Sequence, residues 1–126
     1  MSILFDDVFT LISVDAEGKK FDSVSRLEAK SENYHMALTL DVNSEIYQIP
    51  QKFSLLLSSV LELDGSNLGE RYEYVMHGRV YKFEPTDKKM ALYVSFGGLL
   101  MEMKGDPRHL SNFKLGSNIY LLIKKL

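Results

Sequence analysis

The histidines are the side chains of this 126-residue chain best suited to acid–base or metal chemistry. His35, His77 and His109 lie far apart, with no His-x-x-x-His or Glu-x-x-His spacing that would place two ligands on one metal. Cysteine is absent, which excludes disulfides, zinc ribbons and thiol chemistry. We therefore predict no catalytic residue, no metal and no cofactor, and we expect that the chain is not an enzyme.

The carboxylates offer no catalytic pair either. Asp6 and Asp7 are neighbours in a segment with the character of a strand, where successive side chains point to opposite faces. They cannot converge on one substrate atom, so we predict that both, like Asp64, are surface charges. Gly97 and Gly98 are not expected to hold a phosphate, because no helix follows them to supply an N-terminus.

Aromatic and basic side chains interleave in the segment 71–83, as they do in platforms that stack single-stranded nucleic acid. Such a platform would use Tyr72, Tyr74, Arg79, Tyr81 and Lys82. Alternatively, Tyr72, Tyr74 and Phe83 fill a barrel interior, as aromatic side chains on half-buried strands usually do. The formal net charge of −2 disfavours a dedicated nucleic-acid binder. A free single-strand-binding protein stays as the alternative function, and we expect nucleic-acid contact to be weak or indirect.

Period-two alternation dominates the elements that would position these residues. The apolar residues of one parity in the segment 34–42 are Tyr34, Met36, Leu38, Leu40 and Val42. Three of the four residues between them are polar, which predicts a strand with one core face and one solvated face. His35 falls on the polar parity, which favours a solvated imidazole.

The pair Gly97-Gly98 between two apolar runs predicts a β-hairpin with a type I′ turn, which needs positive φ at both glycines. The predicted register opposes Phe96 to Leu99, Val94 to Met101, and Leu92 to Met103. Opposed residues share a face of the sheet, and all six are apolar. The other face pairs Ser95 with Leu100 and Tyr93 with Glu102.

The segment 72–83 changes parity, from Tyr72, Tyr74 and Met76 to Tyr81 and Phe83. This predicts a bulge or bend near Gly78, unless both faces are partly buried. Further strands are predicted over 3–12, 22–30, 53–62 and 118–124. A short helix is expected after Asp106-Pro107, with Gly116 just beyond its end.

These elements predict one all-β domain over residues 1–126, with seven or eight strands in a closed barrel or a sandwich. Closure is favoured because it removes exposed sheet edges. A ligand-carrying barrel is a further alternative, although Met76, Met101 and Met103 suggest a filled interior and no small-molecule substrate. No run approaches the roughly 18 apolar residues of a membrane helix, so we expect a soluble intracellular protein without a membrane partner.

Six stretches carry a resemblance to a known family: ILFDDVF (3–9), EGKKFDSVSRL (17–27), LDVNSEIY (40–47), YEYVMHGRVYKFE (72–84), YVSFGGLLMEMKGD (93–106) and YLLIKKL (120–126). In this order they span nearly the whole chain. The sequence resembles the small common subunit, numbered eight, that eukaryotic RNA polymerases I, II and III share. One departure is a short connection, about Leu63 to Arg71, where family members usually carry a long acidic loop.

The resemblance implies an oligonucleotide/oligosaccharide-binding (OB) type fold, elaborated into a closed antiparallel barrel of about eight strands. It also implies a nuclear, non-catalytic subunit that docks on the outside of the polymerase, chiefly against the largest subunit. The partner interface that we predict is Tyr93, Ser95, Phe96, Gly97, Gly98, Leu99, Leu100, Met101, Tyr120, Leu122 and Lys124. Leu100 is the strongest candidate in this interface, because it is an apolar side chain next to Ser95 on the outer face of the hairpin.

Overall fold

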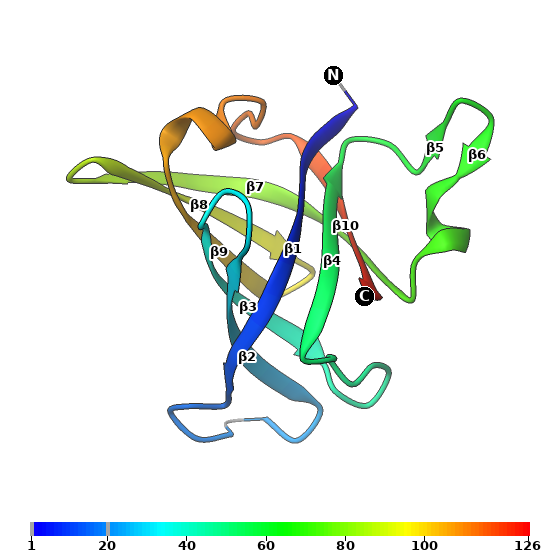
Figure 1. The fold of residues 1–126 in the computed structure, drawn as a ribbon, viewed down its shortest axis with the longest axis vertical. Helices are drawn as coiled ribbons and strands as arrows, with labels where there is room; N and C mark the ends of the chain where they lie inside the picture. Colours follow the sequence, from blue (N-terminus) through cyan, green and yellow to red (C-terminus); the bar gives the residue numbers. More distant parts are fainter. Residues whose placement is uncertain (1, 20) are drawn as a thin grey trace.

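Eight antiparallel strands close into a barrel in the computed structural model, which describes residues 2–19 and 21–126 (Figure 1). The strands are β1 (Ile3–Val14), β2 (Val24–Ser31), β3 (Ala37–Asn43), β4 (Lys52–Ser58), β7 (Tyr74–Thr86), β8 (Lys89–Phe96), β9 (Leu99–Gly105) and β10 (Asn118–Lys125). Their order around the barrel is β1-β2-β3-β9-β8-β7-β10-β4. The predicted all-β closed barrel of about eight strands is confirmed.

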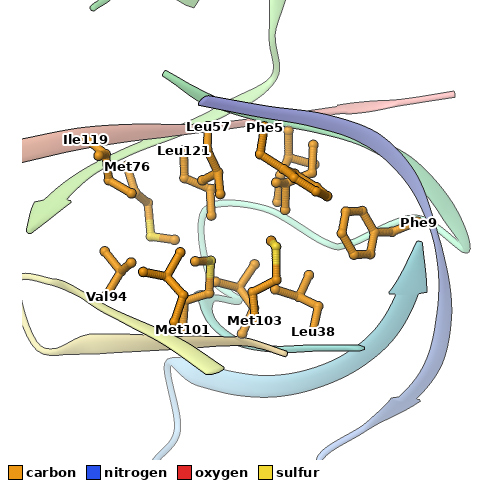
Figure 2. Packing of buried hydrophobic residues seen from close by; sticks show 14 of the residues in the cluster. Phe5, Phe9, Leu38, Leu57, Met76, Val94, Met101, Met103, Ile119 and Leu121 are labelled. Atoms are coloured by element: carbon orange, nitrogen blue, oxygen red, sulfur yellow. The ribbon is translucent and has the colours of Figure 1, made fainter. Parts of the chain in front are cut away.

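The interior is filled by alternate side chains of every strand. Leu38, Leu40 and Val42 of β3 are buried, as their shared parity predicts. In Figure 2, Met76, Leu57 and Ile119 extend from one wall toward Val94, Met101 and Met103 of the opposite wall. Tyr34, predicted to share the core face, is 42% exposed because it lies in the turn between β2 and β3, before the strand begins.

The β8–β9 hairpin has the predicted register, with Phe96 opposite Leu99 and Val94 opposite Met101. Gly97 and Gly98 have φ values of 64° and 102°, which are the positive angles that the two-residue turn requires. Turn chemistry and apolar alternation therefore specify the same pairing.

The bulge in β7 lies between Val80 and Lys82, three residues beyond the predicted position near Gly78. Gly78 has a different role. A Cβ atom on this residue would lie 2.4 Å from the carbonyl oxygen of Ser95 and 2.5 Å from the ring of Phe96. Glycine is therefore needed at position 78 because two neighbours approach the backbone closely. The change of parity occurs instead at the bulge, which places Phe83 against the core.

The predicted strand 53–62 ends earlier, at Ser58, where the chain leaves the barrel. The Ser58 hydroxyl donates to the carbonyl of Val60 and accepts from its N–H, which turns the backbone outward. The excursion that follows contains the two-stranded ribbon β5 (Glu62–Leu63) and β6 (Ser66–Asn67) and the 3₁₀ turn η1 (Leu68–Arg71). We call residues 59–73 the outer loop.

The helix expected after Asp106 is a single 3₁₀ turn, η2 (Pro107–Leu110). Asp106 is its N-cap, as predicted, and accepts from the N–H of Arg108 at 2.9 Å. The turn ends at Leu110, well before Gly116, so the predicted position of the helix end is wrong.

Asp7 is not a surface charge, because its side chain is turned into the barrel and the residue is only 3% exposed. Its carboxylate accepts from the N–H groups of Val8, Asn33 and Tyr34 and from the amide of Asn33. These bonds tie β1 to the β2–β3 turn and satisfy the buried charge. Asp6, on the opposite face, is exposed, as is Asp64.

Candidate partner interface

The outward face of β9, β8 and β7 continues onto the start of β10, just before the second predicted interface segment at 120–124. Leu100 lies opposite Ser95, Ser95 opposite Arg79, and Arg79 opposite Asn118. Directly opposed residues share one face, so these four form a row across four adjacent strands. Arg79, predicted for the nucleic-acid face, thus lies between the hairpin segment and β10. We call this surface the open face.

Tyr93 is held firmly in the open face. It lies opposite both Glu102 and Lys82, and its hydroxyl donates to Glu102 at 2.5 Å, with Glu84 at 3.3 Å. The hydrogen bond to Glu102 raises the pKa of Tyr93 well above its ordinary value, so the phenol stays neutral. The Lys82 ammonium lies 5.2 Å from the ring centroid of Tyr93 and 3.3 Å from Glu84. The ring is therefore pre-oriented for contact.

Apolar side chains are exposed beside Tyr93. Leu100 is 40% exposed and Tyr81, whose ring centroid is 6.1 Å from that of Tyr93, is 45% exposed. Tyr93 and Leu100 border a shallow hollow of about 200 Å³ that extends toward Arg26 and Thr39. Exposed aromatic and Arg side chains are enriched in protein–protein contact sites, and Leu100 adds apolar area beside them.

Three of the predicted interface residues are buried within this chain and present almost no surface. Phe96 and Met101 point into the barrel and are 5% and 1% exposed. Leu122 points outward from β10 but is 0% exposed, because Leu68 of the outer loop packs over it and Leu56. The exposed or half-buried members are Tyr93, Ser95, Gly97, Gly98, Leu99, Leu100, Tyr120 and Lys124.

The β10 members of the predicted interface already contact this chain. Tyr120 packs against the outer-loop cluster, and its ring centroid lies 4.7 Å from that of His77. The Lys124 ammonium lies 4.8 Å from the centroid of the Tyr72 ring. Partial desolvation and the neighbouring Asp7 raise the pKa of the exposed Asp6 carboxyl, and the charge of Lys124 partly offsets this rise. These residues therefore have less free surface for a partner than the hairpin does.

The predicted nucleic-acid platform is not assembled. Tyr74 is 5% exposed; its hydroxyl accepts from the N–H of Asn43, and its ring stacks on Tyr47 with centroids 5.3 Å apart. Tyr72 lies beneath Lys124. The remaining members, Arg79, Tyr81 and Lys82, are exposed and belong to the open face.

Asp41 is a positioning residue whose role and burial the alternation pattern did not indicate. It has the polar parity of its strand, yet it is 6% exposed, and its carboxylate pairs with the Arg26 guanidinium at 2.7 and 3.1 Å. It also accepts from the backbone N–H of Leu100 at 3.0 Å. This bond fixes the start of β9 where pairing with β3 ends. The side-chain pattern of β3 gave no signal for a bond to a backbone group 59 residues away.

The described part of the chain brings no three His, Cys, Asp or Glu side chains together as a metal site. The histidines lie apart: His77 against Tyr120, His109 with its ring 4.4 Å from that of Tyr34, and His35 in a turn. Among the same residues, no helix has the length and apolar character to cross a membrane.

A family model for RNA polymerase Rpb8 matches residues 6–125. The chain belongs to the RNA polymerase Rpb8 family. It is 44% identical to "DNA-directed RNA polymerases II, IV and V subunit 8B" of Arabidopsis thaliana, over 98% of this chain and 97% of the relative. It is 43% identical to "DNA-directed RNA polymerases I, II, and III subunit rpabc3" of Dictyostelium discoideum, over 98% of each chain.

A Schizosaccharomyces pombe relative, "DNA-directed RNA polymerases I, II, and III subunit RPABC3", is 41% identical over 98% of each chain. The Arabidopsis alignment runs over 141 positions, more than the 126 residues present here, so that relative has residues that this Rpb8-family chain lacks. The S. pombe alignment covers 125 positions. Among solved structures, molybdate-bound ModG aligns at 12% identity over 98% of this chain and 92% of that chain, with a TM-score of 0.36 that is too low to indicate a shared fold.

Proposed function

We propose that this chain is a non-catalytic structural subunit of nuclear DNA-directed RNA polymerases and supports the assembly of polymerases I, II and III. The observation that carries the proposal is the similarity, over 98% of the chain, to relatives named as subunits of these enzymes. The contribution to the complex that we propose is contact with other subunits rather than chemistry.

The proposed docking surface is the open face, and the proposed partner is the largest subunit, with other polymerase subunits beside it. Leu100, Tyr81 and the oriented ring of Tyr93 provide the apolar contact, and Arg79 lies between them and β10. The expected role involves no membrane and no small-molecule substrate. Glu84 and Glu102 lie beside Tyr93 on this face and would repel phosphates, so we expect any nucleic-acid contact to be weak or indirect.

The first experiment is to tag the chain in its own cells, purify it gently and identify the recovered proteins by mass. We expect the large subunits of the polymerases. Recovery of the chain alone, or with nucleic acid that salt removes, would contradict the proposal and favour the free single-strand binder.

Leu100→Asp tests the open face directly. This substitution places a charge in the apolar contact, so we expect it to reduce recovery of polymerase subunits roughly tenfold or more. The melting temperature of the isolated chain should stay close to that of the wild type, since the side chain is outward and 40% exposed. Leu115→Asp is the matched control, because Leu115 is 66% exposed and lies outside the face. Normal incorporation of Leu100→Asp would exclude this face as the docking surface.

A further inference from the structure

A groove of about 490 Å³ lies on the outside of β2 and β3, next to the tip of the β8–β9 hairpin. Residues 15–18 and Phe21, from the connection between β1 and β2, form one wall, and the hairpin glycines form the other. Arg26, Glu28 and Thr39 line the groove between them.

The wall formed by the β1–β2 connection is fixed by hydrogen bonds in the free chain. The N–H of Asp15 donates to the carbonyl of Arg26 at 2.7 Å, and the N–H of Arg26 donates to the Asp15 carboxylate at 2.9 Å. The Lys19 ammonium donates to the carbonyl of Val24 and the hydroxyl of Ser25, at 3.1 and 3.0 Å. A ligand would therefore meet a preformed groove and lose little free energy in ordering it.

The groove combines an apolar contact with a negative charge. Phe21 is 68% exposed, so covering its ring with an apolar group would remove a large apolar area from water. Asp15, Glu17 and Glu28 form no ion pair with any residue that the structure describes. Arg26 pairs with Asp41, and the charge of Glu17 also raises the pKa of Arg26, so one cation in the lining faces four carboxylates. The lining is therefore complementary to a positive charge beside an apolar side chain.

The groove is continuous with the open face. It shares Arg26 and Thr39 with the hollow beside Tyr93 and Leu100, so the two depressions adjoin on one outward surface. β2 and β3 are each hydrogen-bonded to a neighbour on both sides. Strand addition is therefore excluded, and recognition at this groove depends on side chains.

We propose that the groove receives an extended segment of a polymerase subunit that carries a Lys or Arg beside an apolar side chain. The apolar side chain packs on Phe21, and the cation lies among the carboxylates of Asp15, Glu17 and Glu28. A nucleic acid does not fit, because these carboxylates repel phosphates. The inference rests on the proposed function, since it takes the partner to be a polymerase chain.

Photo-crosslinking from position 21 identifies the occupant. A photoreactive phenylalanine analogue replaces Phe21 in the tagged chain in its own cells, and the same analogue replaces Leu115 as the control. We expect position 21 alone to crosslink to a polymerase subunit, within a segment that contains Lys or Arg next to an apolar residue. Crosslinks to an acidic segment, to nucleic acid or to a second copy of this chain would overturn the proposal, as would equal crosslinking from both positions.

A double substitution, Glu17→Lys with Phe21→Ser, tests the charge and the apolar contact together. Both residues are exposed, so the melting temperature should not change. We expect retention of polymerase subunits at moderate salt to fall roughly tenfold or more, as for loss of a contact hot spot. Glu62→Lys, on the exposed ribbon outside the groove, is the control and should retain them.

The two proposals fail in different ways. If the wild-type chain recovers polymerase subunits and the double variant retains them equally, the groove is not a docking site and the proposed function stands. If the wild-type chain recovers no polymerase subunit, the proposed function itself fails.

Discussion

Two outward surfaces of the same barrel carry apolar side chains, but the chain covers these side chains on only one of the two surfaces. Over β4 and β10, Leu56 and Leu122 are covered by Leu68 of the outer loop, and all three are almost fully buried. On the open face, Leu100 and Tyr81 stay exposed. Figure 1 shows the ribbon β5–β6 on one side of the barrel and the projecting β7–β8 hairpin on the other.

The difference between the two surfaces supports the proposal that a partner binds on the open face. An apolar group on the outside of a barrel gains free energy only when something removes it from water. The outer loop does so over β4 and β10, whereas no described residue covers Leu100 to the same extent. Outward apolar residues can be covered within the chain or by a partner. The surface over β4 and β10 shows the first case, and we propose the second for the open face.

The largest expected effect separates the two surfaces by stability. Leu122→Ala should lower the free energy of unfolding by about 2–4 kcal/mol, because it leaves a cavity under the outer loop. Leu100→Ala should change it by less than about 0.5 kcal/mol, as for other surface substitutions. Denaturant unfolding of both variants measures the two values. Equal effects would mean that the covered and open surfaces do not differ as described.

A second, smaller effect compares the turns that serve the two surfaces. Gly98 and Gly65 both have positive φ, and a Cβ atom on either would meet nothing within 4 Å. Valine at either position should therefore cost about 1–2 kcal/mol through backbone strain alone. Only Gly98→Val should also reduce recovery of polymerase subunits, because its hairpin carries the open face. An unchanged melting temperature in Gly98→Val would contradict the turn geometry.

Sequence patterns predicted the parts of the fold that depend on neighbours in the chain. The β8–β9 register followed from Gly97-Gly98 and the apolar alternation, and the strand count and turns indicated a closed barrel. The bulge was predicted near Gly78 because glycine usually marks such sites, but here its missing side chain makes room for Phe96, and the bulge follows Val80.

The predictions that failed concern residues whose contacts come from distant segments of the chain. Asp7 was assigned to the surface because its partners, Asn33 and Tyr34, come from another hairpin. Leu122 was assigned to the interface because nothing in β10 indicates that Leu68 covers it. The two candidate faces were separate in sequence, yet pairing of β7 with β8 and β10 places their exposed members on one surface.

The smallest effect lies outside both surfaces, at the cap of η2. Hydrogen bonds from Arg108 lower the pKa of Asp106 from 3.8 to about 2. A depressed carboxyl pKa stabilises the fold above the unfolded pKa, and that stabilisation is lost as the pH falls toward 2. Asp106→Asn should therefore melt slightly below the wild type at pH 7. The difference in melting temperature between the two proteins should become smaller between pH 4 and pH 2. A difference that stays constant over this range would contradict the assignment of the stabilisation to the ionised Asp106 carboxylate.

Hydrogen exchange of the free chain and of the same chain within purified polymerase tests the central claim most directly. We expect new protection in the complex over the β8–β9 hairpin, around Tyr93 to Leu100, and unchanged exchange over the outer loop at 59–73. Protection confined to the outer loop, with the hairpin exchanging as in the free chain, would contradict the assignment of the open face to the partner.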